Sequence, residues 1–116
     1  MVTFVAYETA KKLNKLLPPI VEALKKRSAD LADQIERASS SVLINLGEGN
    51  RRGGKDKRRF FVMAHGSAGE IRAVLELADL WNIKLDATEF EAVLDHQLAL
   101  LWGLTHSRKI AGRTGS

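Results

Sequence analysis

The sequence of 116 residues contains no cysteine and only two prolines. The absence of cysteine excludes disulfide bonds and thiolate metal sites. Charged residues interrupt every apolar run well before the ~18 residues that a membrane-spanning helix needs. The first residues also lack the positive segment and the long apolar core of a secretory signal. We therefore expect a cytoplasmic protein that does not enter a membrane and that is stabilised by packed apolar faces.

Residue groups typical of catalytic and metal sites are also missing. The three histidines, His65, His96 and His106, have no second histidine three or four residues away and no glutamate three residues before them. The zinc-protease and di-iron bundle signatures both require such pairs. A structural histidine is the simpler explanation for each. We therefore expect no enzyme activity, no metal and no cofactor.

Residues 49–55 match the first seven positions of a phosphate-binding loop, G-x-x-x-x-G-K. The next residue is Asp56, where that motif needs serine or threonine to bind magnesium, and a carboxylate there would repel the phosphates. The motif also requires a parallel sheet, which this chain does not indicate. The match is therefore rejected.

Apolar residues recur with helical spacing in four blocks, and no block shows the strict alternation of a half-buried strand. Breaks are expected near residues 27, 53 and 84, and the adjacent Pro18 and Pro19 should kink the first helix. Ser28 is the expected N-cap of the second helix, and the fourth helix should open at Asp86. Because short connections make neighbouring helices antiparallel, the pattern predicts an all-α, antiparallel up-down-up-down four-helix bundle over residues 1–107. Residues 108–116 should form a flexible basic tail. The expected core positions are Ala6, Ala10, Leu13, Leu17, Ile20, Leu24, Leu31, Ile35, Ala38, Val42, Asn45, Leu46, Gly49, Phe60, Ala64, Ser67, Ile71, Val74, Leu75, Ala78, Phe90, Leu94, Gln97, Leu101 and Leu104.

Positive charge is concentrated between residues 51 and 59, where six cations and one anion give a local charge of +5. The net charge of the chain is +4, so the remainder sums to −1. Such a concentration is typical of a site for a polyanion, although cations at a helix C-terminus also stabilise the helix dipole. The bundle topology would add Arg108, Lys109 and Arg113 to the same end. The candidate nucleic-acid-binding residues, which we call the basic cluster, are Arg51, Arg52, Lys55, Lys57, Arg58 and Arg59.

Some apolar side chains lie off the core stripe and need another partner. On a helical wheel Leu43 and Ile44 lie about 120° to 140° from the core positions of their helix. The back face of the third helix has small and apolar residues, with glycines that would permit close approach of another helix. Self-association is favoured, while scattered exposed apolar residues on a monomer are the alternative. The candidate oligomer interface is Leu43, Ile44, Val62, Gly66, Gly69 and Leu80.

The turn near residues 53 and 54 also sets a register between the second and third helices. Residues whose numbers sum to about 107 should lie at one level, which places Arg37 opposite Glu70. The same arithmetic places Glu48 opposite Arg58 or Arg59. Partly exposed pairs of this kind could fix the register while contributing only about 0 to 1 kcal/mol each.

A set of residues on the second and third expected helices carries a resemblance to a known family: Gln34, Ile35, Arg37, Ala38, Ser41, Asn45, Leu46, Gly47, Glu48, Gly49, Phe60, Phe61, Ala64, Gly66, Ser67 and Glu70. With these residues the chain resembles bacterial four-helix-bundle proteins encoded in intervening sequences of 23S ribosomal RNA genes, distantly similar to accessory proteins of diversity-generating retroelements. The resemblance implies a homopentameric ring, and the retroelement relatives are basic and associate with nucleic acid and a reverse transcriptase. The structural motif residues of the resemblance are Arg37, Asn45, Glu48, Gly49 and Glu70, and no catalytic residue is implied.

Together these observations predict a non-catalytic, homo-oligomeric protein that contacts RNA or DNA phosphates through the basic cluster. The alternative is a protein-interaction scaffold, for example an accessory to a nucleic-acid enzyme such as a reverse transcriptase. The two differ in salt dependence, because phosphate contacts make log K fall linearly with log salt.

Overall fold

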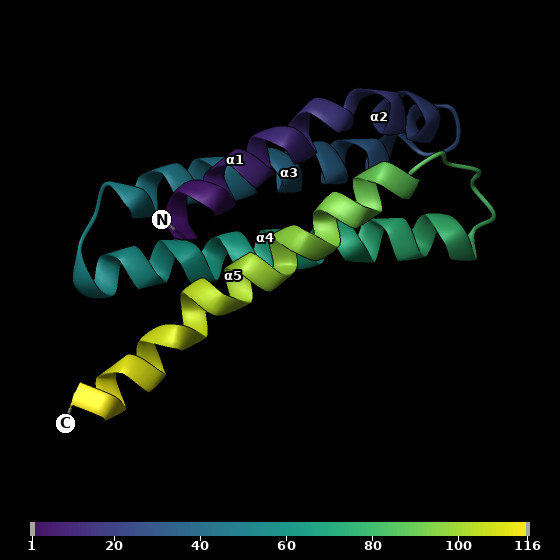
Figure 1. Ribbon diagram of the computed structural model, residues 1–116. Coiled ribbons are helices and arrows are strands. Elements are labelled where there is room, and N and C mark those ends of the chain that lie inside the picture. The colour runs from purple at the N-terminus through teal and green to yellow at the C-terminus, as the bar shows by residue number, and fades with distance from the viewer. Residues whose placement is uncertain (1, 116) are drawn as a thin grey trace.

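The computed structural model describes the backbone of residues 2–115 and the side chains of residues 5–106. Within these bounds the chain forms helices and short connections, with no strand. The all-α prediction is therefore confirmed. The helices are α1 (Val2–Leu16), α2 (Pro18–Lys25), α3 (Ala29–Asn50), α4 (Gly54–Leu80) and α5 (Thr88–Gly115) (Figure 1).

The described chain has five helices instead of four because the first expected helix is divided at Leu17. Pro18 and Pro19 follow directly, and Pro18 has no backbone N–H to continue the helical hydrogen bonds. The Leu17 N–H instead reaches the Asn14 carbonyl at 3.4 Å. Leu17 itself keeps helical backbone angles, φ −71° and ψ −40°. The interruption therefore corresponds to the predicted kink.

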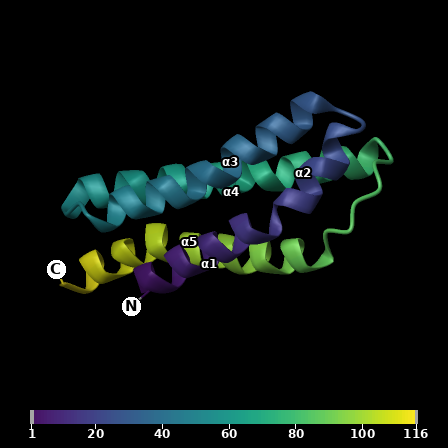
Figure 2. The ribbon, with the colours of Figure 1, turned by 90° about the horizontal axis from the view of Figure 1, so that it is seen from above.

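Four of the helices form a closed ring of contacts. α3 and α4 lie side by side along their lengths, joined by a short turn at residues 51–53 (Figures 1 and 2). α5 packs against α4, and α1 packs against both α5 and α3, while α2 packs against α3. The core lies inside this ring.

The core positions predicted on α1, α2 and α3 are all buried. On α4 the prediction of Phe60 is wrong, because Phe60 is half-buried and its neighbour Phe61 is 3% exposed. Ser67 and Leu104 are also half-buried instead of fully buried. Phe61 occupies the core because Gly49 has no side chain there: a Cβ on Gly49 would lie 2.6 Å from Phe61 Cε1.

Buried and half-buried polar groups form hydrogen bonds between helices. Asn14 Nδ2 donates to the Ser39 carbonyl oxygen at 3.0 Å, which joins α1 to α3. The Ser67 hydroxyl donates to the Ser41 hydroxyl at 2.9 Å, which joins α4 to α3. Gln97, which is fully buried, donates through Nε2 to the carbonyl oxygen of Ala6 at 3.2 Å. Because a buried donor without a partner is costly, these bonds favour one register.

The helix ends agree only in part with those predicted from the sequence. Ser28 caps α3 as expected, since its extended backbone presents Oγ to the Leu31 N–H at 3.1 Å. α5 begins at Thr88, two residues after the Asp86 that was expected to open it. α5 also extends beyond residue 107, where the tail was expected to start. The flexibility of residues 108–116 stays a prediction, and the side chains of Arg108, Lys109 and Arg113 lie outside the described residues.

Candidate nucleic-acid interface

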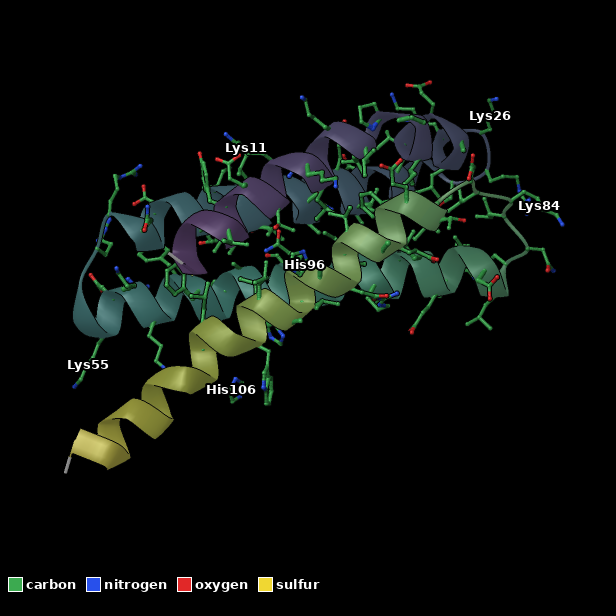
Figure 3. All side chains as sticks on the ribbon, in the orientation of Figure 1. Lys11, Lys26, Lys55, Lys84, His96 and His106 are labelled. Carbon is green, nitrogen blue, oxygen red and sulfur yellow. The ribbon has the colours of Figure 1, made fainter. Side chains whose placement is uncertain are left out.

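The basic cluster spans the last turn of α3, the connection and the first turns of α4. Lys57 is half-buried and the other five cations are exposed. Lys55 lies at this end of the molecule, whereas Lys26 and Lys84 lie at the opposite end (Figure 3). The sequence-predicted cations are thus brought together at one end.

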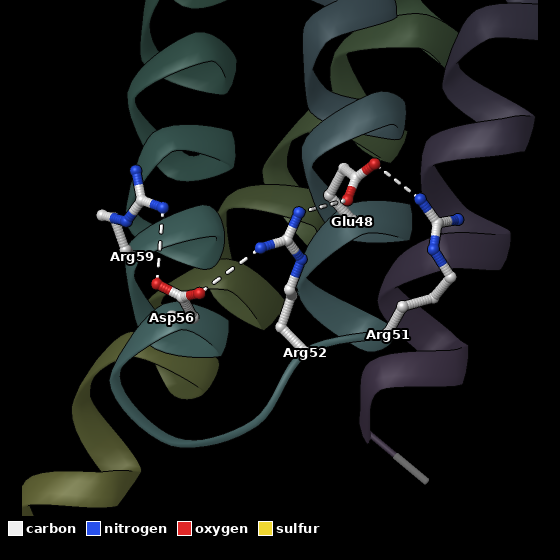
Figure 4. Close-up of polar contacts among 5 residues, drawn as sticks. All are labelled: Glu48, Arg51, Arg52, Asp56 and Arg59. Atoms are coloured by element: carbon white, nitrogen blue, oxygen red, sulfur yellow. Dashed lines mark hydrogen bonds and ion pairs between the residues drawn. The ribbon is translucent and has the colours of Figure 1, made fainter.

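Glu48 holds the two arginines at the end of α3 (Figure 4). Its carboxylate lies 2.5 Å from Arg51 Nη2 and 3.4 Å from Arg52 Nη2. Arg58 and Arg59 have other partners, so the ion pair that the register arithmetic suggested between Glu48 and one of them is not formed. Arg51 and Arg52 follow Glu48 by three and four residues, so they reach it without crossing to another helix.

Asp56 continues this network into α4. Its two carboxylate oxygens each lie 3.4 Å from a guanidinium nitrogen, one of Arg52 and one of Arg59 (Figure 4). Arg52 thus contacts both carboxylates of the network. Asp56 also lies in the first turn of α4, where a negative charge is favourable to the helix dipole. The one anion inside the cluster therefore orients two of its cations.

The ring of Phe60 lies close to two of the same arginines. The Cζ atom of Arg52 is 5.1 Å from the centre of its ring, and that of Arg59 is 4.9 Å away. These distances are typical of cation–π contacts. Phe60 was predicted to lie in the core. The nearby Arg52 and Arg59 in the sequence were the signal that its ring would contact cations instead.

The other three cations have different surroundings. Arg58 Nη2 donates to the Thr105 carbonyl oxygen on α5 at 3.0 Å, so it joins the start of α4 to α5. Lys55 and Lys57 form no ion pair with any described side chain. Residues 48–59 keep a net charge of +4 once Glu48 and Asp56 are counted. The cluster is therefore only partly neutralised by its own carboxylates.

The structural motif residues lie beside the turn and along the α3–α4 contact. Arg37 and Glu70 line one groove between these helices, yet Arg37 Nε pairs with Asp33 at 3.6 Å. Asn45 is buried and donates through Nδ2 to the carbonyl oxygen and the hydroxyl of Ser41, at 2.9 and 3.0 Å. The bonds of Asn45 and Arg37 therefore stay within α3, and the Arg37–Glu70 ion pair is not formed.

The candidate oligomer interface is mostly exposed. The exposed fractions of Ile44, Val62 and Leu80 are 63%, 45% and 74%. A Cβ added at Gly66 or Gly69 would meet nothing within 4 Å. That these residues form an interface stays a prediction.

Leu43 differs from this set, because it is half-buried and packs against the core. α1 covers that side of α3, as the proximity of Tyr7 to Gly47 shows: a Cβ on Gly47 would lie 3.5 Å from the Tyr7 ring. Leu43 was therefore placed on the wrong side of α3.

The described side chains do not form a site for a metal ion, since no three or more histidine, aspartate or glutamate side chains among them are placed to hold one. No described helix combines the length and the apolar character that crossing a membrane requires.

The chain matches the model of a known protein family over most of its length. The model of the family described as "23S rRNA-intervening sequence protein" matches residues 3–99, which include the whole basic cluster and the α3–α4 turn. No curated protein and no solved structure matches the chain significantly.

Proposed function

Because the chain belongs to the 23S rRNA-intervening sequence protein family, we propose that it binds nucleic acid, RNA above all, through the phosphates. The basic cluster is the binding surface. The observation that carries this proposal is the net charge of +4 over residues 48–59, with Lys55 and Lys57 free of carboxylate partners among the described side chains. The protein acts as a cytoplasmic homo-oligomer and has no catalytic activity.

The cluster suits phosphates because its arginines are ordered before a ligand binds. Arg52 and Arg59 contact both Asp56 and the Phe60 ring, so fewer rotamers are lost on binding. A guanidinium has five N–H donors, so each of these arginines retains donors for a phosphate. Contacts of this kind position a nucleic acid without reading its bases.

Self-association would repeat this weak site around an assembly. In the proposed fold α1 and α2 act as one kinked helix of an antiparallel up-down-up-down four-helix bundle. Exposed Ile44, Val62 and Leu80 support contact between copies, and the family resemblance implies five copies. Several clusters on one particle would bind a long polyanion with avidity.

The test is the affinity for RNA measured against salt concentration. The decisive variant is Lys55→Gln combined with Lys57→Gln, since neither side chain supports an ion pair in the described structure. The matched control is Lys26→Gln combined with Lys84→Gln, which removes the same charge from exposed positions at the opposite end (Figure 3). We expect the first variant to lose affinity and to flatten the slope of log K against log salt, and the control to change both less.

A protein-interaction scaffold, for example an accessory to a reverse transcriptase, is the second candidate function. Glu48 and Asp56 show that carboxylates fit among these arginines, so an acidic segment of a partner could bind in the same way. If the unmodified protein shows no salt-dependent binding to RNA or DNA at low ionic strength, nucleic-acid binding is wrong and the scaffold takes its place.

A further inference from the structure

Trp102 on α5 forms an exposed aromatic surface. Trp102 is 56% exposed, the most of the phenylalanine, tyrosine and tryptophan residues whose side chains the structure describes. The His106 ring lies against it, with 3.3 Å between ring centres and an interplanar angle of 21°. The His106 side chain points outward from α5 in Figure 3. Two flat rings are therefore stacked on the surface of the helix.

Local hydrogen bonds hold this stack in place. His106 Nδ1 lies 2.9 Å from the Trp102 carbonyl oxygen and 2.8 Å from Thr105 Oγ1. Because a carbonyl oxygen only accepts, the first contact requires a proton on Nδ1. The Thr105 hydroxyl also donates to the Trp102 carbonyl, at 3.1 Å. The His106 ring is thus fixed against the indole before any ligand binds.

The stack lies beside a member of the basic cluster. Thr105, whose hydroxyl supports the stack, accepts the Arg58 hydrogen bond through its carbonyl oxygen. Trp102 is one helical turn from Thr105, which is a rise of about 5 Å. His65 lies two turns after Arg58 on α4, and its ring centre is 6.5 Å from that of Trp102. Aromatic rings and a cation therefore share the α4–α5 edge next to the proposed phosphate site.

We propose that Trp102 and His106 form a platform on which an unpaired base of single-stranded RNA stacks while Arg58 contacts the adjoining phosphate. This inference rests on the proposed function and specifies its ligand. Bases of a duplex have their faces covered by neighbouring pairs, whereas unpaired bases are free to stack on aromatic side chains. The charge of the neighbouring cluster selects a nucleic-acid strand over an apolar partner. The platform adds a preference for unpaired RNA that phosphate contacts alone cannot give.

Trp81 provides a matched control within the same chain. It is 49% exposed at the end of α4, and its carbonyl oxygen accepts from Arg27 at 3.4 Å. No described aromatic ring stacks on it, and it lies on the connection to α5, at the end of α4 opposite the basic cluster. The two tryptophans therefore have similar exposure and different surroundings.

The experiment compares single-stranded and duplex RNA of about 12 nucleotides, within the usual range of single-strand site sizes. Trp102→Ala should weaken binding of single-stranded oligouridine about tenfold and should change duplex binding much less. Trp81→Ala should change neither. Trp102→Phe should keep part of the affinity because it keeps a ring. In Trp81→Phe, where Trp102 is the remaining tryptophan, oligouridine should quench the fluorescence, whereas in Trp102→Phe it should not.

Three results would overturn the platform. Equal losses for both RNAs, or no loss, would show that Trp102 does not stack on bases while leaving phosphate binding intact. A lower mass of Trp102→Ala in light scattering would assign the surface to contacts between copies of the chain. Absence of any RNA binding by the unmodified protein would remove the proposed function and this inference with it.

Discussion

Gly49 on α3 and Phe61 on α4 are packed so closely that a Cβ on Gly49 would lie 2.6 Å from Phe61 Cε1 and 2.9 Å from Cδ1. Real Cβ atoms do not approach other atoms this closely. Phe61 is 3% exposed, so its ring has little space into which it could move. The pair therefore sets the separation of the two helices directly beside the turn that carries the basic cluster.

Gly49→Ala should destabilise the protein although alanine is the better helix former. The overlap with Phe61 should cost about 1 to 3 kcal/mol, which exceeds the gain of roughly 1 kcal/mol in helix propensity. Thermal unfolding followed by circular dichroism measures the change. Gly49→Ala combined with Phe61→Leu removes the ring that clashes, so the two substitutions should destabilise less than the sum of their separate effects. Strict additivity would show that the clash is relieved elsewhere.

Glu48→Gln should strengthen RNA binding. The substitution releases Arg51 and Arg52 from their carboxylate partner and raises the local charge by one. We expect an affinity increase of several-fold at low salt and a steeper slope of log K against log salt. Folding stability should change by less than about 1 kcal/mol, because both arginines are exposed and Glu48 is only half-buried. Glu36→Gln is the control, since it removes the same charge from α3 about 18 Å further along the helix. Weaker binding in Glu48→Gln would mean that Glu48 orients the arginines more than it neutralises them.

Ile44→Lys should reduce the mass of the assembly while leaving its helicity unchanged. Ile44 is 63% exposed, so a lysine fits the single chain without loss of core packing, but it would place a charge inside a contact between copies. Light scattering and circular dichroism make the two measurements. Val5→Lys, at an apolar position on α1 that is 44% exposed, should leave the mass unchanged. An unaltered mass for Ile44→Lys would exclude this face from the interface.

Gly69→Ala tests whether another copy packs on the back face of α4, with a substitution that should stabilise the single chain. In a single chain the added methyl group meets nothing within 4 Å, so helix propensity should raise stability by about 1 kcal/mol. In an assembly that brings another helix against Gly69, the same methyl group should lower the affinity between copies. Unfolding measured at several protein concentrations separates the effects. A gain in stability that is independent of concentration would indicate that no helix approaches there.

The helices and most of the core could be predicted because each is encoded locally. Every core position that the apolar spacing predicted on α3 is buried. Ser28 was predicted to cap this helix from its residue type and its place before the apolar stripe. The choice between Phe60 and Phe61 could not be made in this way. Both residues lie near the boundary of the apolar stripe, and the deciding factor is the room that Gly49 leaves on a different helix.

For the candidate site, too, the residue types could be predicted from the sequence and their contacts could not. The concentration of cations between residues 51 and 59 was visible in the sequence, but its ion pairs were not. The predicted register gave Glu48 a partner across the turn. In the structure Glu48 pairs instead with Arg51 and Arg52, which follow it by three and four residues. The Trp102–His106 stack also has helical spacing, yet that spacing is equally typical of core residues. Only the exposure of Trp102 distinguishes the two.

The hydrogen bond from Gln97 to the Ala6 carbonyl joins residues 91 positions apart. During synthesis on a ribosome, the face of α1 that α5 covers must therefore wait until most of the chain has been translated. α3 and α4 are joined by a short turn and can pair much sooner. The nascent chain thus carries an open seam along α1, whose apolar residues a chaperone or another copy of the chain could occupy first. Closure by α5 is the step at which this competition ends.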